Sequence, residues 1–508
     1  MCDIFNKVTN QAELFPNKVA IIENNGDTLT YRQLMISVNR YTTFLQNKIG
    51  KNYEKVAICI YEGKITPIIV LALSFLRHTI IPLNPRLKSN QLKYLLSSVD
   101  AKTVIVDSNT INLFKEVEIN TIKIDCNFKY KDNTIVRPNK INNYDDFIIT
   151  LSSGSTGDPK PIVISEQVKM MRFAQAVEIF TVTSDDVILC ASPFFHSLGQ
   201  RLTLLPLVAG ATLVQLPNFT TKKWCEMVIE HRVTFTISVS SHLHLVMDNL
   251  LKSPNDFNSL RCLVSSSASI DKDVKSKLFK LLGCEFHEMY GATEIATATN
   301  LNQVDSLKKP ASVGAPCKNV KIRIVNDNFL DKNTMELGKI IIKSPLASSG
   351  YYNQPKVTDK FFVSGYFVTG DIGFLDKDGF LYFVDREKDI IISGGENIYP
   401  SDIEACINKH SSVDSSIVIG IDDIYFGEVP VAVVVAMVDD HILIEKQLRL
   451  FLRSNLASNQ QPMKYFFRKS FPLTPSGKID RRKLQNSINS FGLDLSAKLR
   501  QIQKIKNK

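Results

Sequence analysis

The chain contains Thr150-Leu151-Ser152-Ser153-Gly154-Ser155-Thr156-Gly157-Asp158-Pro159-Lys160, a run of hydroxyl residues and glycines that ends in a lysine. Apolar segments stand on both sides, Phe147-Ile148-Ile149 before the run and Pro161-Ile162-Val163-Ile164 after it. This pattern predicts a buried strand that leads into a loop, with apolar chain resuming directly after it. Gly154 and Gly157 permit positive φ and let the backbone approach a ligand closely.

The chemistry of this loop suits a polyphosphate. Its hydroxyl and amide groups are hydrogen-bond donors, and Lys160 adds a positive charge. The loop differs from the Walker pattern, because Lys160 does not directly follow Gly157 and no Lys-Ser/Thr pair opens a helix. The alternative is a solvated Ser/Gly linker. We favour the phosphate loop, since a linker has no need of apolar segments on both sides.

Length and composition set the broad class. A chain of 508 residues is too long for one compact core, so two or more domains are expected. Hydrophobic residues make up 44% and charged residues 22%, which is ordinary for a soluble globular protein. The net charge of +10 suits an anionic ligand, but it is spread along the chain and does not favour nucleic-acid binding. The exception is a basic tail at 497–508, which is typical of a solvated end.

The nine cysteines are scattered, with no Cys-x-x-Cys pair, which predicts reduced thiols in a cytoplasmic protein. We find no metal-ligand spacing; His242 and His244 stand two apart, which favours a structural role. The first 19 residues carry charges and do not resemble a secretion signal. The longest apolar run, from Ile68 to Leu76, is far below the ~20 residues of a membrane helix. We expect no transmembrane segment.

Short apolar strands alternate with helices through most of the chain. Expected strands include 56–60, 79–82, 103–107, 187–190, 211–214, 234–237 and 261–264, and a helix is expected from Leu29-Thr30-Tyr31 onward. This rhythm predicts a parallel sheet covered on both faces. Segments 321–325 and 338–343 alternate like antiparallel strands. From 389 onward the pattern predicts a small α+β unit. The expected fold class is α/β, with layered α/β subdomains, a β-barrel-like part and a small C-terminal α+β domain.

Four later motifs share the character of the opening loop. They are Tyr290-Gly291-Ala292-Thr293-Glu294, Gly370-Asp371, the pair of segments Asp385-Arg386-Glu387-Lys388-Asp389 and Ser393-Gly394-Gly395, and Thr474-Pro475-Ser476-Gly477-Lys478. With the loop they resemble, in order and spacing, the adenylate-forming superfamily of acyl-CoA and aryl-CoA synthetases, peptide-synthetase adenylation domains and luciferase-like enzymes. The resemblance covers nearly the whole chain. It implies an N-terminal AMP-binding domain at 1–387 and a mobile C-terminal lid at 388–508, hinged near Lys388.

The resemblance also implies how ATP and Mg²⁺ are bound. The residues expected to hold the β- and γ-phosphates are Ser152, Ser153, Gly154, Ser155, Thr156, Gly157 and Lys160. Tyr290 would stack on adenine, Asp371 would accept hydrogen bonds from both ribose hydroxyls, and Arg386 would reach the ribose or a phosphate. Thr293 would face the α-phosphate. Glu294, with Thr156, would bind Mg²⁺, which prefers oxygen ligands. Outside the resemblance, each of these residues has an ordinary structural role as its alternative.

Lys478 is the expected central catalytic group, grouped with His196, Thr293 and Glu294. In the family the matching lysine bridges the substrate carboxylate and the α-phosphate and offsets their repulsion. Two half-reactions are implied: the carboxylate and Mg·ATP give acyl-AMP and pyrophosphate, and a thiol then displaces AMP. Between them the C-terminal domain turns about Lys388, and the loop with Gly394 and Gly395 approaches the pantetheine tunnel of coenzyme A.

The acid itself is only partly constrained. Pro193-Phe194-Phe195-His196 resembles the stretch where acyl-CoA and aryl-CoA synthetases carry an aromatic-His pair, which puts His196 in the pocket wall. No aspartate occurs between Pro193 and Leu207, so an amino-acid substrate is disfavoured. The chain departs from the family at Pro161, where glycine is usual, and at Ser265-Ser266-Ser267-Ala268-Ser269. Both departures bear on how nucleotide and acid fit.

The predicted function is therefore an ATP-dependent carboxylic acid–CoA ligase acting on a small acid. The alternative is a free-standing adenylating enzyme that loads the phosphopantetheine arm of an acyl carrier protein. Luciferase-like oxidation and a catalytically inactive scaffold are the rivals from other classes. A homodimer is left open.

Overall fold

The computed structural model describes residues 3–50, 52–61, 63–125, 146–151, 160–266, 270, 275, 278, 283–423, 426–474 and 478–489. The predicted phosphate loop at 152–157 and the basic tail lie outside the described residues. The chain divides into two compact units. The first comprises 1–322 and 342–367, and the second comprises 323–341 and 368–508. Each is described by itself, and the predicted boundary at Lys388 stays a prediction.

The larger sheet of the first unit has nine strands. Their order is β15(Ala315–Pro316), β14(Ala296–Leu301), β13(Glu285–Ala292), β12(Cys262–Ser266), β11(Phe235–Val239), β9(Val187–Cys190), β10(Thr212–Gln215), β1(Val19–Ile22), β2(Thr28–Thr30). The six strands from β13 to β1 are parallel to one another, and β14, β15 and β2 are antiparallel additions. The carboxyl ends of the six therefore meet at one edge, the usual place for ligands in such sheets.

A second sheet of the first unit has seven strands. Their order is β18(Gly350–Tyr351), β8(Pro161–Ser165), β7(Asp146–Leu151), β4(Thr79–Pro82), β3(Lys55–Cys59), β5(Thr103–Val106), β6(Asn120–Lys123). β7 and β8 are antiparallel neighbours, with Leu151 opposite Pro161. The strand predicted before the opening loop and the apolar segment after it are both present as strands, and the loop joins their paired ends.

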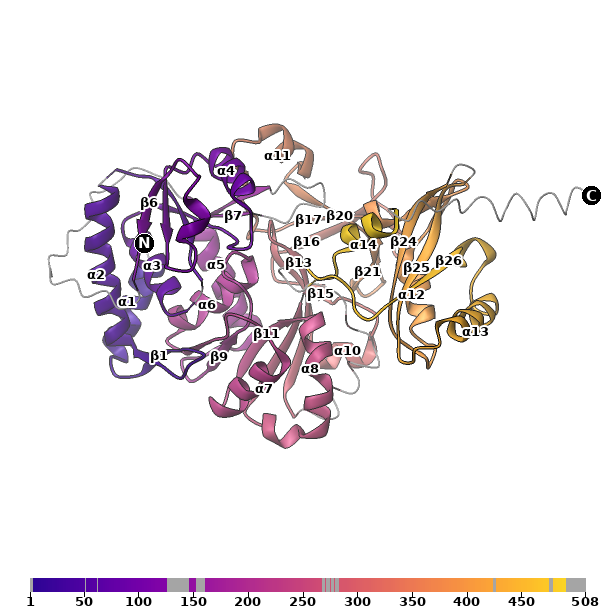
Figure 1. The fold of residues 1–508 in the computed structure, drawn as a ribbon, viewed down its shortest axis with the longest axis horizontal. Coiled ribbons are helices and arrows are strands. Elements are labelled where there is room, and N and C mark those ends of the chain that lie inside the picture. The colour runs from indigo at the N-terminus through magenta and orange to yellow at the C-terminus, as the bar shows by residue number, and fades with distance from the viewer. Residues whose placement is uncertain are drawn as a thin grey trace, which may run out of the picture. The chain divides into compact units, whose positions relative to one another are not determined.

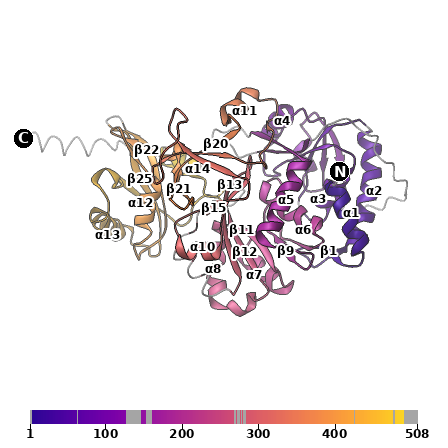
Figure 2. The same ribbon diagram turned by 180° about the vertical axis from the view of Figure 1, so that it is seen from behind.

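Helices cover these sheets on both faces (Figure 1). They are α1(Ile4–Leu14), α2(Tyr31–Ile49), α3(Ile65–Phe75), α4(Ser89–Ser98), α5(Glu166–Phe180), α6(Ser197–Ala209), α7(Thr221–Glu230), α8(Ser240–Lys252), α10(Gln303–Lys308) and α11(Pro355–Phe361). The main core joins α2, α3, α5 and α6 to both sheets, and α7 and α8 pack on the other face of the larger sheet (Figure 2). As predicted, a helix begins at Tyr31, because Thr30 and Gln33 form a capping box.

A third, five-stranded sheet has the order β16(Lys321–Val325), β17(Gly338–Lys343), β20(Tyr366–Leu375), β19(Phe362–Val363), with β21(Leu381–Arg386) also paired to β20. The antiparallel strands predicted at 321–325 and 338–343 are both present. The short 3₁₀ helices are η1(Ile111–Phe114), η2(Pro254–Phe257), η3(Glu387–Asp389) and η4(Ser458–Gln460).

The second unit contains the small α+β arrangement expected from 389 onward. Its sheet has the order β23(Glu396–Ile398), β22(Ile391–Ser393), β25(Gly427–Ala436), β24(Val413–Asp423), and β26(Lys464–Arg468) runs parallel to β25. α12(Pro400–Ile407) and α13(His441–Arg453) pack on one face, and α14(Arg481–Asn489) packs on the other. In the described part of the chain, no helix has the length and hydrophobicity that a membrane crossing requires.

Candidate active site

Glu294 occupies the turn between β13 and β14, at the carboxyl end of the parallel strands. The Tyr351 hydroxyl donates a hydrogen bond of 2.9 Å to its Oε1. Burial and the neighbouring carboxylate both raise the pKa of Tyr351, so the hydroxyl remains a donor. Tyr290, predicted to stack on adenine, lies in β13, and Thr293, predicted to face the α-phosphate, lies in the turn that follows. Both side chains are half-buried. Gly291 has a structural reason as well, since a Cβ there would lie 1.9 Å from the Ala296 carbonyl oxygen.

Lys160 is the one described member of the predicted phosphate-binding set. Its Nζ lies 3.7 Å from the centre of the Phe361 ring and 5.5 Å from that of Tyr351. Burial lowers the pKa of Lys160, Glu294 opposes that effect, and Lys360 adds to it. The structure therefore brings Lys160 into the electrostatic range of Glu294, as expected for a cation beside a nucleotide. Pro161 begins β8 and does not interrupt the strand pairing.

Three basic side chains are buried together, and we call Lys169, Arg172 and Arg201 the cationic group. Of the three, Arg172 contacts Glu294 directly, through the backbone carbonyl of Glu294. Lys169 donates to Gln200 Oε1 at 2.8 Å, and Arg172 donates to the carbonyl oxygens of Leu346 and Glu294 at 2.8 to 3.2 Å. Arg201 donates to Thr297 Oγ1 at 3.1 Å. Within the described ranges, none of the three forms an ion pair with a carboxylate.

The pKa shifts of the cationic group indicate that it lacks a closely paired anion. Burial, followed by repulsion from Arg172 and Arg201, lowers the pKa of Lys169 well below its usual value. Burial, followed by repulsion from Arg201, lowers the pKa of Arg172 to about 9 against the opposing effect of Glu294, and burial lowers the pKa of Arg201 to about 10. Both guanidinium groups are still charged at neutral pH. A nearby anion would stabilise all three.

Gln200 connects the cationic group to the predicted phosphate loop. Its Nε2 donates to Thr150 Oγ1 at 3.1 Å, and its Oε1 accepts from Lys169. Thr150 is the second-last residue of β7, directly before the loop. The cationic group thus lies between the start of the loop and the turn with Glu294, two segments that are far apart in sequence.

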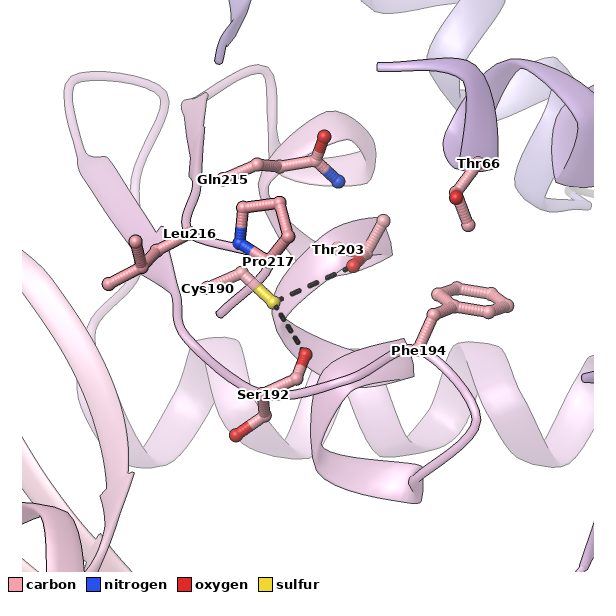
Figure 3. Close-up of a pocket in the computed structure, with 8 residues that line it drawn as sticks. All are labelled: Thr66, Cys190, Ser192, Phe194, Thr203, Gln215, Leu216 and Pro217. Atoms are coloured by element: carbon pink, nitrogen blue, oxygen red, sulfur yellow. Dashed lines mark hydrogen bonds between the residues drawn. The ribbon is translucent and has the colours of Figure 1, made fainter. Parts of the chain in front are cut away.

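His196 stands at the N-cap position of α6, half-buried, with its ring centre 4.4 Å from that of Phe195. Gly199 lets the preceding segment pack tightly, because a Cβ there would lie 2.0 Å from the Pro193 carbonyl oxygen. A small pocket lies between β9, β10 and α6, lined by Thr66, Cys190, Ser192, Phe194, Thr203, Gln215, Leu216 and Pro217 (Figure 3). This pocket has room for about one water molecule. It is too small for an organic acid.

Asp371 and Arg386, in the second unit, face each other across β20 and β21. Arg386 Nε lies 3.4 Å from Asp371 Oδ1, and the Asp371 side chain is 9% exposed while that of Arg386 is 52% exposed. Gly370, just before Asp371, has φ +74° and takes the strand through a backbone conformation that side chains disfavour. The carboxylate and the guanidinium are thus adjacent, and their predicted contacts with the ribose or a phosphate stay predictions.

Gly394 and Gly395 form the two-residue turn between β22 and β23. Their φ values are +60° and +85°, and both must be positive in a type I′ hairpin. The two glycines therefore have a structural reason independent of pantetheine. Lys478 is exposed; its N–H donates to Thr474 Oγ1 at 3.1 Å, and Leu473 is bridged to Ile479. Lys388 lies in η3 and is the predicted hinge.

The described groups fit the ligands that the resemblance implies. Glu294 offers a half-buried carboxylate oxygen, the ligand type that Mg²⁺ prefers. The cationic group and Lys160 offer the positive charge that a triphosphate requires. Sequence reasoning missed Tyr351 and the cationic group. The only signal in the sequence is a lysine and an arginine three residues apart in an otherwise apolar helix segment.

Known proteins match this fold over nearly its full length. The AMP-binding enzyme model matches residues 8–352, and the model of the AMP-binding enzyme C-terminal domain matches residues 402–478. A 2-succinylbenzoate–CoA ligase of Geobacillus sp. (strain WCH70) is 30% identical, covering 95% of this chain and 97% of the relative. A long-chain-fatty-acid–CoA ligase of Bacillus subtilis (strain 168) is 27% identical, with 94% and 93% covered.

Two solved structures extend the likeness. The o-succinylbenzoate CoA synthetase from Bacillus subtilis, in complex with its acyl-adenylate intermediate, has a TM-score of 0.85 at 25% identity and covers 94% of this chain and 98% of that one. The same synthetase with ATP and a magnesium ion has a TM-score of 0.82 at 26% identity, with 94% and 99% covered. The predicted resemblance and the predicted fold class are confirmed.

Proposed function

Because the chain belongs to the family of AMP-binding enzymes, we propose that it is an ATP-dependent ligase that joins a carboxylic acid to coenzyme A. Relatives of nearly the same length carry that activity in their names. The observation that supports it within this chain is the cationic group. Among the described residues its three buried basic side chains form no ion pair with a carboxylate. They lie between the turn with Glu294 and the start of the predicted phosphate loop, where anionic reactants would compensate their charge.

In the first half-reaction a carboxylate oxygen of the acid attacks the α-phosphorus of ATP, the bond to the bridging oxygen breaks, and pyrophosphate leaves. The cationic group and Lys160 stabilise the negative charge that two anions bring together. Glu294 would hold Mg²⁺, and the ion would supply positive charge that offsets that of the phosphates. Thr293 donates to the α-phosphate, Tyr290 stacks on adenine, and Lys478 bridges the two reacting groups.

In the second half-reaction the thiolate of coenzyme A attacks the acyl carbon, and AMP leaves with the electron pair of the mixed anhydride. Asp371 and Arg386 keep the ribose in place through both steps. His196 contributes to the wall of the acyl pocket. Ser152, Ser153, Gly154, Ser155, Thr156 and Gly157 remain predictions for phosphate and metal binding.

The proposal also includes finer points that the family alone leaves open. The alternative acceptor is an acyl carrier protein, which presents the same pantetheine thiol. The proposed site of action is the cytoplasm, and a second copy of the chain is a possible partner. The proposed mobile lid at 388–508 turns about Lys388 and brings Gly394 and Gly395 to the thiol.

The test is ATP–pyrophosphate exchange with a panel of acids that includes 2-succinylbenzoate, long-chain fatty acids and aryl acids. Acid-dependent exchange with one class is the expected result, followed by thioester formation with free coenzyme A. Exchange without thioester from coenzyme A, but with transfer to a phosphopantetheinylated carrier protein, would favour the alternative. No exchange with any acid would contradict the proposed function.

A further inference from the structure

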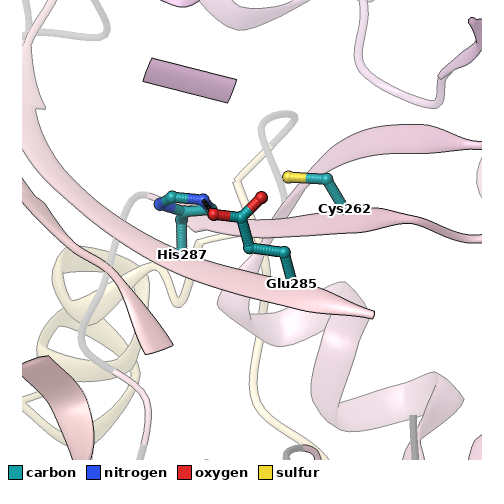
Figure 4. A group of neighbouring side chains, drawn as sticks. All are labelled: Cys262, Glu285 and His287. Carbon is teal, nitrogen blue, oxygen red and sulfur yellow. Dashed lines mark ion pairs between the residues drawn. The ribbon is translucent and has the colours of Figure 1, made fainter. Parts of the chain in front are cut away.

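A second group of polar side chains lies at the opposite, amino-terminal edge of the same parallel strands. Cys262 begins β12, Glu285 begins β13, and His287 follows two residues later. Cys262 and Glu285 are paired in the strand register, so all three side chains project from the same face of the sheet (Figure 4). The sulfur atom, a carboxylate oxygen and a ring nitrogen all lie within 4.8 Å of one another.

The contacts of the His287 ring nitrogens indicate that this group of side chains can bind an ion. Its side chain is 3% exposed, and Nδ1 lies 3.1 Å from Asn300 Oδ1. Because an amide oxygen only accepts, Nδ1 is the donor in this contact, and Nε2 is the ring nitrogen left to bind another group. Nε2 is buried and makes no hydrogen bond in the described structure, although Glu285 Oε1 is only 3.0 Å away. A carboxylate oxygen and the ring nitrogen available to a metal ion therefore face each other at short range.

The side chains around Cys262, Glu285 and His287 allow a metal ion to bind between them. Arg261, next to Cys262, is committed to Asp186 through contacts of 2.6 and 2.7 Å. The Phe180 ring packs against His287 with centres 5.2 Å apart and keeps that side of the imidazole apolar. The Glu285 side chain is 47% exposed, so an ion can enter from solvent on that side.

We propose that Cys262, Glu285 and His287 bind one divalent transition-metal ion, and that zinc fits best. A thiolate, an imidazole and a carboxylate are the ligands that zinc takes in proteins, with water in the fourth position. Bonds of about 2.0–2.3 Å hold tetrahedral ligand atoms about 3.3–3.8 Å apart. The His287 nitrogen and the Glu285 oxygen, 3.0 Å apart, therefore need to separate slightly, and the Cys262 sulfur needs to approach them by at most about 1 Å. Binding releases the Cys262 proton to solvent. The hydrogen bond from Nδ1 to Asn300 orients the ring, as second partners of metal-bound histidines do.

This site is separate from the proposed adenylation centre. Five strand residues, at about 3.3 Å each, put about 16 Å between Glu285 and Tyr290. The ion would fasten β12 and β13 to each other and, through Asn300, to β14. It would stabilise the strand whose other end carries Glu294, without touching substrate.

The test is zinc binding by the full chain after removal of metals with a chelator. Equilibrium dialysis in excess Mg²⁺, which occupies the site at Glu294, is expected to give one zinc per chain. Cys262→Ser and His287→Gln should each weaken binding at least about tenfold, and Asn300→Leu about tenfold. Cys225→Ser removes another buried thiol, on α7, and should leave binding unchanged.

Cobalt provides an independent readout, because a thiolate bound to Co²⁺ gives a charge-transfer absorption band that Cys262→Ser should abolish and Cys225→Ser should retain. Glu285→Gln changes a half-exposed side chain, so this variant should fold. It therefore tests the site even if the substitutions of the buried Cys262 and His287 prevent folding. A wild-type chain that takes up no zinc would overturn the proposal. So would unchanged affinity in Glu285→Gln together with an unaltered cobalt spectrum in Cys262→Ser.

Discussion

Two sets of buried charges in the first unit are organised in opposite ways. At the amino end of β12, Arg261 makes two hydrogen bonds to Asp186, whose side chain is 2% exposed. At the carboxyl end of the sheet, the hydrogen bonds described for the cationic group all go to neutral acceptors, and the nearby Glu294 carboxylate acts on Arg172 without forming an ion pair with it. A buried ion pair is destroyed by removing one member, whereas a buried charge without a counterion opposes folding. The difference indicates that the first set serves the fold and the second serves an anionic reactant.

The largest expected effect falls on the paired set. Arg261→Met leaves the Asp186 carboxylate buried without its cation, which should lower the free energy of unfolding by about 3 to 5 kcal/mol. Urea denaturation measures it. Lys318→Met, which removes an exposed ion pair with Glu178, is the control and should change the value by less than about 1 kcal/mol. Equal effects of the two variants would remove the contrast between buried and exposed pairs.

A large effect on activity is expected beside the cationic group. Glu294→Gln keeps the size of the side chain but removes the carboxylate beside Lys160 and Arg172. Adenylation should slow by about 10²–10³-fold, measured as ATP–pyrophosphate exchange at saturating acid. Tyr351→Phe removes only the hydrogen bond to Glu294 and should cost about tenfold. Retention of full activity in Glu294→Gln would exclude this carboxylate from the reaction.

His78 sharpens the comparison, since it is a buried base that avoids charge altogether. Burial lowers its pKa to about 4, and Nδ1 accepts from the Glu54 N–H at 3.1 Å. Because the unfolded chain binds the proton more readily, stability is complete above pH 6.5 and is lost as pH falls towards 4. The loss reaches up to about 3 kcal/mol.

The measurement for His78 is the free energy of unfolding between pH 4 and 7. His78→Asn retains an acceptor for the Glu54 N–H and should flatten this dependence. A wild-type profile that keeps its full slope in the variant would show that other groups, such as His242 with its pKa also lowered by burial to about 4, control acid stability.

The smallest expected effect is on the stability of Lys169→Met, and its sign is opposite to that expected for Arg261→Met. Lys169→Met removes a fully buried ammonium group, and Gln200 keeps its hydrogen bond to Thr150. Without nucleotide, the variant should be as stable as the wild type or about 1 kcal/mol more stable. The same urea experiment checks it. Destabilisation of several kcal/mol would mean that Lys169 belongs to the structural set.

Local signals in the sequence predicted much of the fold. Thr30 begins a helix because hydroxyl and amide side chains cap its first turn, and the apolar segments around the opening loop form β7 and β8 because both are buried. These features depend on neighbours a few residues apart. The structure does not describe 152–157, so the phosphate-binding role of that loop stays a prediction.

The groups that sequence reasoning missed depend on distant neighbours. Lys169 and Arg172 are charged residues three apart in a helix, a spacing typical of a solvated face, and only the packing of α5 between two sheets buries them. Cys262 and Glu285 are far apart in the chain and meet because β12 and β13 are paired in register. Spacing rules for metal ligands describe local motifs and contain no information on strand register.

The affinity of the chain for Mg·ATP, measured by calorimetry with wild type and Lys169→Met, tests the central claim most directly. A buried positive charge near the phosphates would contribute on the order of 1 to 2 kcal/mol through an effective dielectric of about 20. The account predicts a variant that is no less stable when free but binds Mg·ATP about tenfold more weakly. An unchanged affinity, with stability lost instead, would contradict it.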